Sequence, residues 1–456
     1  MRRLFPILLV AALAPAIARG AVFQPVATGG MGDITNNKIW YPMIRYNGYL
    51  YLGSGWFNAA QEGCEIWRSG DGGATWGQVA QTGIVGNSKN RFVIDFEIFG
   101  GDLYLAAVNN VDGGGVWRSS DGLTWTQVNT PGFGDSTNIG VTQLQEFQGY
   151  LYAGTWNIDE GSELWRSPDG NAWEIVADDG YGFGFETRDT TILTVRGDTM
   201  LVATENFEFG GQLYATTDGL TFTQVNPNGF DGNDNVNVFG LAYFHGDLYA
   251  STWNATGGEV WRRPWGGSVW TRVVNNGFGD AFNSLFTLAA FDDQLWVGGS
   301  EIFFGAPIRR SADGVLFTPV DTPGLGNFRN EWVAQFNVLD DRLWVGMQNQ
   351  NHGAELHRTI ATGLIDGDGD GWFGEDDDCP TTFDPGQDDA DGDLFGDACD
   401  CDPLDPAVNP DAAEDCNGID DNCDGAVDEG YDGDSAGGTG CGGDCDYGNP
   451  AVNPGE

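Results

Sequence analysis

The feature that most constrains this chain is a repeat of about 48 residues that fills its first 360 positions. Each copy opens with a Gly or Asp turn and an apolar stretch. These stretches begin at Leu50, Leu103, Leu151, Met200, Leu248, Leu295 and Leu343. A second mark, Trp-Arg-Ser or a variant of it, follows each one. Abundant Gly and aromatic residues favour short strands and tight turns over helices, so the repeat predicts an array of β units.

A third mark, an aromatic residue followed by Val two or three positions later, occurs in only six copies. It falls at Trp76, Trp125, Trp173, Phe222, Trp270 and Phe317, and no copy lies near Ile365. Residues 23–26 (Phe-Gln-Pro-Val) closely match residues 317–320 (Phe-Thr-Pro-Val). We therefore expect the N-terminal strand to complete the seventh copy. The predicted fold is all-β, a seven-bladed β-propeller over residues 22–360 in which closure protects the strand edges.

Residues 69–76 follow the pattern S-x-D-x-G-x-T-W, and shorter relatives precede Trp125, Trp173, Phe222 and Phe317. This turn resembles the Asp-box of sialidase-type repeats. The fifth copy lacks the Asp. The resemblance implies turns at the outer edge of the blades, away from any ligand. Trp40 stands where sialidases carry an Arg two residues before Pro42, and sialidases have six blades, so sialidase activity is not expected.

The two ends of the chain point to export. Arg2, Arg3, the apolar residues 4–14 and Ala16-Ile17-Ala18 are typical of a signal peptide, assigned to residues 1–21. Seven of the eight Cys lie in the C-terminal tail, which predicts disulfides in an oxidising compartment. Residues 366–456 hold 29 Asp and Glu and no Lys or Arg. Such a tail disfavours nucleic acid and anionic membranes as partners.

Loops that join the second and third strands are rich in aromatics and amides. The predicted ligand-binding residues there are Trp156, Asn157, Trp253 and Asn254; packing between blades is the alternative interpretation. Asn residues recur where the first strands begin, and Lys38, Arg91 and Arg188 follow three of these positions. They predict either turn-capping Asn residues or an anion-binding funnel. Acids near the same strand starts, Asp95, Asp189 and Glu331, are the candidates for a paired-carboxylate hydrolase.

The stretch from Asp366 to Asp400 opens with D-x-D-x-D-G, a pattern in which alternating carboxylates converge on one hard cation. Together with Cys379-Pro380 and a second D-x-D-x-D at Asp389, it resembles thrombospondin type 3 repeats, assigned to residues 361–400. The resemblance implies Ca²⁺ ligands and a Cys379–Cys399 disulfide. The ligands expected here are Asp366, Asp368, Asp370, Asp377, Asp389, Asp391, Asp393, Asp397 and Asp400.

Residues 401–429 resemble the metal-binding motif of the copper-associated surface protein MopE, through Cys401-Asp402-Pro403 and the segment from Cys416 to Gly425. Further ligands expected are Asp420, Asn422, Asp424 and Asp428. Oxygen ligands favour Ca²⁺ over copper; a solvated acidic spacer is the alternative. A second copy begins at Cys441 and stops halfway, so we expect the sequence to end within a repeat.

The sequence therefore predicts a secreted, cell-surface or periplasmic monomer without a transmembrane segment. The propeller is expected to recognise a glycan or protein ligand, and the tail is expected to act as a stalk that Ca²⁺ makes rigid. A secreted polysaccharide hydrolase is the alternative function.

Overall fold

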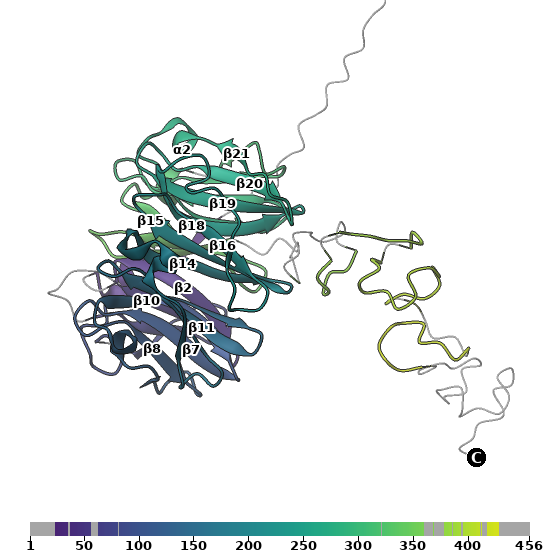
Figure 1. Ribbon diagram of the computed structural model, residues 1–456, viewed down its shortest axis with the longest axis horizontal. Helices are drawn as coiled ribbons and strands as arrows, with labels where there is room; N and C mark the ends of the chain where they lie inside the picture. Colours follow the sequence, from purple (N-terminus) through teal and green to yellow (C-terminus); the bar gives the residue numbers. More distant parts are fainter. Residues whose placement is uncertain are drawn as a thin grey trace, which may run out of the picture.

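The computed structural model describes residues 23–34, 37–55, 63–80, 82–320, 322–359, 368, 378–384, 386–393, 395–410, 412 and 417–427. The predicted signal peptide lies outside these residues. Strands dominate, and they form successive four-stranded antiparallel units that we name A to G in chain order (Figure 1).

Unit A contains β2 (Ile39–Tyr46), β3 (Tyr49–Gly55), β4 (Ile66–Ser69) and β5 (Gly77–Ala80). Unit B contains β6 (Phe92–Phe99), β7 (Asp102–Val108), β8 (Gly115–Ser119) and β9 (Thr126–Gln127). Unit C contains β10 (Asn138–Phe147), β11 (Tyr150–Asn157), β12 (Leu164–Ser167) and β13 (Glu174–Ala177). Unit D contains β14 (Thr187–Arg196), β15 (Thr199–Asn206), β16 (Leu213–Thr216) and β17 (Thr223–Gln224).

Unit E contains β18 (Asn235–Phe244), β19 (Asp247–Asn254), β20 (Val260–Pro264) and β21 (Thr271–Val274). Unit F contains β22 (Leu285–Ala290), β23 (Leu295–Gly299), β24 (Ile308–Ser311) and β25 (Thr318–Pro319). Unit G contains β26 (Trp332–Val338), β27 (Leu343–Gln348), β28 (Glu355–Thr359) and, from the other end of the sequence, β1 (Phe23–Ala27). Helical turns are three or four residues long: α1 (Asp179–Gly182), α2 (Asn276–Gly279), η1 (Gly29–Gly32), η2 (Pro131–Gly134), η3 (Gly184–Glu186) and η4 (Pro323–Gly326).

Tight turns connect the first and second strands of the units. Asn47 and Gly48 both have positive φ, 48° and 82°, and Gln148 with Gly149 repeats this geometry at 51° and 79°. Two successive residues with positive φ match the right-handed twist of a β-hairpin. The Gly or Asp turns that precede each apolar strand in the sequence are therefore hairpin turns.

The hydrophobic core lies between neighbouring units. Tyr51 and Ile66 of unit A share one cluster with Val93, Leu105 and Trp117 of unit B, and the same arrangement recurs along the chain. A further cluster joins Trp40, Leu50 and Leu52 of unit A to Trp344 and Leu356 of unit G. The units at the two ends of the repeat array therefore pack on each other.

Glycines permit these interfaces to be close. A Cβ added to Gly122 of the next unit would lie only 1.9 Å from the hydroxyl oxygen of Tyr51. A Cβ added to Gly219 would lie equally close to the hydroxyl oxygen of Tyr152. Any side chain on these glycines would overlap the tyrosine, and both also have positive φ. Trp344 of unit G approaches Gly73 of unit A, with 2.5 Å to the position of an added Cβ.

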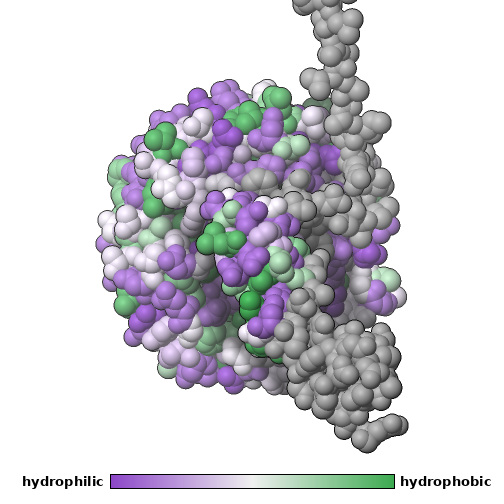
Figure 2. Space-filling model, turned by 90° about the vertical axis from the view of Figure 1, so that its right-hand side faces the viewer, coloured by the Kyte–Doolittle hydropathy of each residue, from purple (hydrophilic) through white to green (hydrophobic). Residues whose placement is uncertain are grey.

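The first strands of successive units contact one another, from β2 and β6 through to β22 and β26, and β2 also contacts β26. The described segments of the tail, coloured yellow-green in Figure 1, contain no regular strand or helix. On the face shown in Figure 2, hydrophobic residues are scattered in small groups among hydrophilic ones. No helix in the described part of the chain is long and apolar enough to cross a membrane.

Candidate functional site

Five turns between the third and fourth strands share one hydrogen-bond pattern. In unit D the Thr216 hydroxyl donates to Asp218 Oδ1 at 3.0 Å, and the same carboxylate oxygen accepts the N–H groups of Leu220 and Thr221 at 2.8 and 2.7 Å. These hydrogen bonds hold the pKa of Asp218 well below its usual range. The Asp carboxylates of these turns accept hydrogen bonds from the turn itself, so their role is structural.

A cavity of about 780 Å³ is lined by the first strands of units B to G. Two of the three candidate catalytic acids, Asp95 on β6 and Asp189 on β14, line this cavity, together with Glu97 and Glu205. The third candidate, Glu331, is not among the lining residues. Its N–H donates to the carbonyl of Gln348 at 2.9 Å, in the loop before β26.

Asp95 and Asp189 reach the same strand, β10, from opposite sides. Asp95 accepts the N–H of Leu144 at 2.8 Å and that of Phe96 at 2.9 Å. Asp189 accepts the hydroxyl of Thr142 at 2.9 Å. Because Thr142 and Leu144 are two residues apart on β10, the two carboxyls lie along one wall of the cavity.

The acids of the cavity hold protons at unusually high pH. Burial raises the pKa of Asp95 to about 7 in spite of its two backbone hydrogen bonds. Burial and the neighbouring Asp95 raise the pKa of Glu97 to about 8. Burial, with Glu205 close by, raises the pKa of Asp189 well above its usual range, and burial also raises that of Glu205. Neutral carboxyls can donate hydrogen bonds as well as accept them.

A row of cross-strand neighbours runs through units C, D and E. Trp156 lies opposite Asp189, Asp189 opposite Glu205, Glu205 opposite Asn237 and Asn237 opposite Trp253. Directly opposed residues project to the same side of a sheet. We call these five residues the Trp156–Trp253 row. Asn237 donates to Glu205 Oε2 at 2.7 Å, and both Trp residues line the cavity.

The amides predicted beside these Trp residues are used within the loops. Asn157 is fully buried, donates to Asn138 Oδ1 at 3.1 Å and accepts the N–H groups of Asp159 and Glu160. Asn254 is likewise buried and donates to Asn235 Oδ1 at 3.3 Å. Both therefore brace the loop after the second strand.

The recurring Asn residues at the starts of the first strands are buried and bonded to backbone. Asn138 donates to the carbonyl of Gly132 at 3.0 Å and to Glu163 at 2.7 Å. Asn235 repeats this with Gly229 at 3.0 Å and Glu259 at 2.8 Å. These contacts match the turn-capping interpretation of the Asn pattern.

The three predicted cations lie in different surroundings; Lys38 and Arg91 follow recurring Asn residues, and Arg188 follows Thr187 at the equivalent position. Lys38 Nζ donates to the carbonyl of Gln350 at 2.5 Å. Arg91 is buried, with 6% of its surface exposed, and the Arg188 guanidinium lies over the ring of Phe207 at 4.7 Å. Phe207 lines the cavity, whereas Lys38, Arg91 and Arg188 are not among its lining residues. The cavity wall is therefore acidic and aromatic rather than cationic.

Sequence reasoning missed Glu97 and Glu205, although both carried a signal. Each lies on a strand of known register, Glu97 two residues after Asp95, and Glu205 opposite Asp189. Residues two apart on a strand share a face, so the strand assignment alone places Glu97 beside Asp95.

In the tail, Asp389, Asp391 and Asp393 bring their carboxylates within 4.8 Å of one another. Burial and then the Asp393 carboxylate raise the pKa of Asp391. Asp391 Oδ2 is inaccessible to solvent and has no hydrogen-bond donor within the described residues. Asn409 from the adjoining segment donates to Asp393 Oδ2 at 2.8 Å. A hard cation fits this set, because it would supply the missing partner of Asp391.

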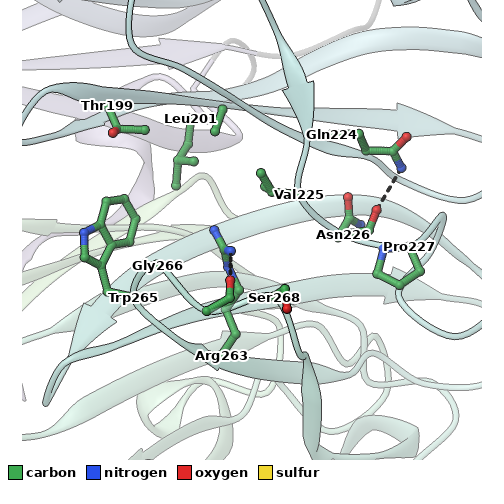
Figure 3. A pocket seen from close by; sticks show the side chains of 12 residues that line it. Thr199, Leu201, Gln224, Val225, Asn226, Pro227, Arg263, Trp265, Gly266 and Ser268 are labelled. Carbon is green, nitrogen blue, oxygen red and sulfur yellow. Dashed lines mark hydrogen bonds between the residues drawn. The ribbon is translucent and has the colours of Figure 1, made fainter.

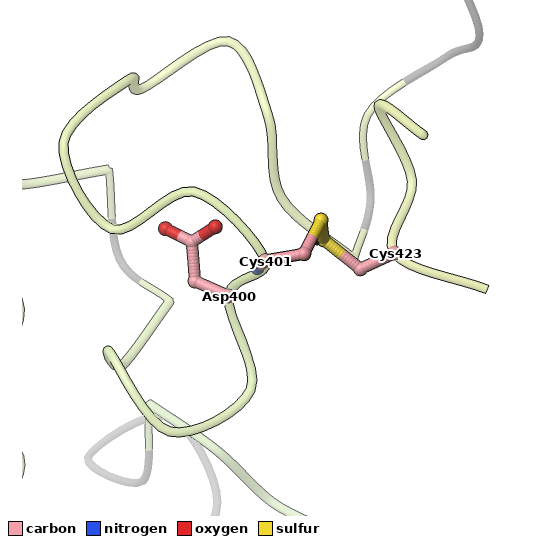
Figure 4. Close-up of side chains that lie close together, drawn as sticks. All are labelled: Asp400, Cys401 and Cys423. Carbon is pink, nitrogen blue, oxygen red and sulfur yellow. Dashed lines mark hydrogen bonds between the residues drawn. A yellow bond between two sulfur atoms is a disulfide. The ribbon is translucent and has the colours of Figure 1, made fainter. Parts of the chain in front are cut away.

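The predicted disulfide Cys379–Cys399 is present, and a second joins Cys401 to Cys423 (Figure 4). Asp400 lies beside the second disulfide, while Asp397 accepts the N–H of Ala390 at 2.9 Å. Because these sulfurs are oxidised, they are not available as thiolate ligands for copper.

The MopE-like segment forms its own carboxylate loop. Asp420 accepts the N–H groups of Asp424 and Gly425 at 3.2 and 2.9 Å, and Asn422 Oδ1 accepts that of Asp424 at 3.0 Å. Asp368 belongs to the described residues. The predicted ligands Asp366, Asp370, Asp377 and Asp428 lie outside them.

No curated protein sequence matches this chain. Among solved structures, YCF48 from Cyanidioschyzon merolae is similar at 11% identity, with 74% of this chain and 99% of that chain covered and a TM-score of 0.53. The α-L-arabinanase of Penicillium chrysogenum complexed with arabinobiose gives 13% identity, coverage of 76% and 98%, and a TM-score of 0.43. The first likeness shows a propeller-like fold.

The family model Cu-binding_MopE, described as "Putative metal-binding motif", matches residues 400–429 and 444–456. The matched stretches include Cys401, Asp420 and Cys423 of the loop described above. The C-terminal region therefore carries a MopE-type metal-binding motif, on a chain whose main body is an all-β, propeller-like fold.

Proposed function

We propose that units A to G form a closed seven-bladed propeller, residues 22–360, of the Asp-box type. The pairing of β1 with β28 supports closure, as do the contacts of β2 with β26. Phe23 of β1 also packs edge-on against Trp296 of unit F, with 5.8 Å between ring centroids. The repeated Asp-centred turns support the Asp-box assignment.

The propeller serves, in this proposal, as a recognition module for an extracellular glycan. The Trp156–Trp253 row is the observation that carries it. Two indole rings and two carboxyls of this row line one cavity of about 780 Å³, and the buried amide of Asn237 donates to one of these carboxyls, that of Glu205. Aromatic faces cover the apolar faces of a sugar ring, and a few placed polar groups fix its hydroxyls. Burial raises the pKa of both carboxyls, and a carboxyl that holds its proton donates a hydrogen bond as well as accepting one.

The tail serves as a Ca²⁺-binding stalk. Asp389, Asp391 and Asp393 are all-oxygen ligands, which Ca²⁺ prefers and copper does not. Thrombospondin type 3-like repeats over residues 361–400 and the MopE-type motif over residues 401–456 would each bind ions. Two disulfides fit an oxidising extracellular or cell-surface location.

The test is a glycan array probed with the full chain in Ca²⁺, with sugar release assayed in parallel. The matched variants are the double substitution Trp156→Ala/Trp253→Ala and, as control, Tyr49→Ala. Tyr49 is an exposed aromatic at the opposite end of its second strand. We expect glycan binding that the double variant loses and the control keeps. Binding only to a protein partner, or equal binding by both variants, would refute the assignment.

A glycoside hydrolase is the second candidate, favoured by the meeting of Asp95 and Asp189 in one cavity. Hydrolysis needs one carboxyl protonated and the other ionised. Burial raises the pKa of Asp95 to about 7 and that of Asp189 well above its usual range, so this pair would supply the ionised carboxyl only in part at neutral pH, and we rank binding first. Sugar release that is lost in both Asp95→Asn and Asp189→Asn would reverse this preference.

A further inference from the structure

Unit E lacks the Ser/Thr–Asp pair that ends the third strand in five other units. In units A, B, C, D and F, the third strand ends in a Ser or Thr whose hydroxyl donates to an Asp two residues later, at 2.8 to 3.1 Å. The register of the strands places Arg263 at this position in unit E, since it pairs with Leu248 as Ser69 pairs with Leu50. The position of the Asp is taken by Trp265. Both members of the turn pair are therefore replaced together.

Arg263 is a buried cation that has no counter-ion among the residues that the structure describes. Only 6% of its surface is exposed. Its Nη1 donates to the carbonyl of Gly267, and its guanidinium lies 5.2 Å from the centre of the Trp270 ring. Nε has no acceptor, and Arg263 forms no ion pair with any acid of the described residues. Burial lowers the pKa of Arg263, yet a guanidinium remains charged at any physiological pH. An uncompensated buried charge is unfavourable unless an anion joins it.

Arg263 points into a pocket of about 620 Å³ between units D and E. Figure 3 shows its guanidinium between Trp265 on one side and Ser268 on the other, beneath Leu201 and Val225. The pocket thus offers one cation, one broad aromatic surface and the hydroxyls of Thr199 and Ser268. This pocket shares no lining residue with the cavity of about 780 Å³ that contains Trp156 and Trp253.

We propose that Arg263 and Trp265 form a second binding site, for a carboxylate attached to a group with an apolar face. The planar guanidinium pairs with carboxylate oxygens through parallel N–H bonds, and the indole covers the apolar face. The site goes beyond the proposed glycan recognition in the central cavity and does not depend on it.

Two sources present this chemistry. One is a uronic acid residue of an acidic polysaccharide. The other is the acidic tail of this chain, which approaches the same place: Phe383 lies 4.7 Å from the guanidinium of Arg196, and Arg196 lies 5.4 Å from the ring of Trp265. Asp384 follows Phe383 directly. An intramolecular carboxylate would occupy the pocket in competition with a free acid.

The test titrates glucuronate, glucose and inorganic sulfate into the full chain by isothermal titration calorimetry. We expect glucuronate to bind at least tenfold more tightly than glucose or sulfate. The variant Arg263→Ser/Trp265→Asp rebuilds the turn of the other units, so it should keep the fold by circular dichroism and lose glucuronate binding at least tenfold. Arg263→Gln, which leaves Trp265 in place, should lose it too. Arg68→Ser, a more exposed Arg on the third strand of unit A, is the control and should keep it.

The variant Asp384→Asn separates the two sources. Tighter glucuronate binding than in the unsubstituted chain identifies the tail as the natural occupant, and unchanged binding identifies an external acid. The proposal is overturned if glucuronate binds no better than glucose or sulfate in both Asp384→Asn and the unsubstituted chain. It is also overturned if Arg68→Ser loses as much binding as Arg263→Gln.

Discussion

Removing the side chain of Phe23 tests whether the first strand stabilises the whole repeat array. Phe23 is 9% exposed and belongs to a cluster that joins units F and G, with its ring edge-on to Trp296 at 5.8 Å. Deleting a buried Phe side chain costs about 3–5 kcal/mol, from lost burial and the cavity left behind. Because Phe23 lies at the rim of its cluster, we expect a loss of about 3 kcal/mol for Phe23→Ala.

The free energy of unfolding is measured by guanidinium denaturation of the full chain, followed by far-ultraviolet circular dichroism and by tryptophan fluorescence. Both signals should shift together, because the strand holds the ends of the array to each other. Phe282→Ala removes the same side chain at a site that is 67% exposed, and is expected to cost less than about 0.5 kcal/mol. An equally small effect at Phe23 would show that β1 does not contribute to the core of unit G.

Three further predictions concern charges. Glu97 has a pKa of about 8 in the folded chain against an ordinary 4.5, so the folded state binds the extra proton and loses stability as pH rises from 4.5 to 8. Glu97→Gln should therefore match the unsubstituted chain in thermal melts below pH 4.5 and exceed it above pH 8, by up to about 5 kcal/mol; a variant that is less stable at pH 9 contradicts this. Asp218→Ala removes the acceptor of two backbone N–H groups in an exposed turn and should lower the midpoint of denaturant unfolding, whereas an unchanged midpoint would mean that the turn is held by other contacts. Asp391→Asn keeps the shape of the carboxylate cluster and removes one charge. Calorimetric titration with Ca²⁺ should therefore show at least one binding site weakened about tenfold, and titration with copper should show no weakened site. Identical Ca²⁺ isotherms for the variant and the unsubstituted chain would exclude Asp391 as a ligand.

The repeat in the sequence predicted the strands well, because each mark has a local physical cause. Apolar stretches such as that at Leu151 became second strands buried on both faces, and the Gly turns before them became hairpins. The likeness of residues 23–26 to residues 317–320 predicted a strand in unit G, and β1 pairs with β28. The disulfide Cys379–Cys399 followed from a family resemblance and is confirmed.

The candidate site was harder to predict, because it depends on pairing between units. Asp189 and Glu205 are neighbours only once β14 and β15 are in register, and Trp156 joins them from the preceding unit. The amides of Asn157 and Asn254 resembled ligand groups in sequence, since nothing local shows that their partners are the caps of the same unit. Arg263 was visible as a departure from the repeat, but its burial and its missing counter-ion appear only after packing.

The pairing of β1 with β28 also determines how the molecule responds to pulling. Phe23 lies opposite Thr359, so the segment before β1 and the segment after β28 leave the sheet at the same end. A force applied between these two segments breaks the hydrogen bonds between β1 and β28 one after another, starting from their shared end. A force between the C-terminal segment and a ligand held among the first strands instead loads β28 against its neighbours along their length. The proposed propeller is therefore weakest when it is pulled between its own two ends, and more resistant when the load runs from the tail to a ligand bound among the first strands.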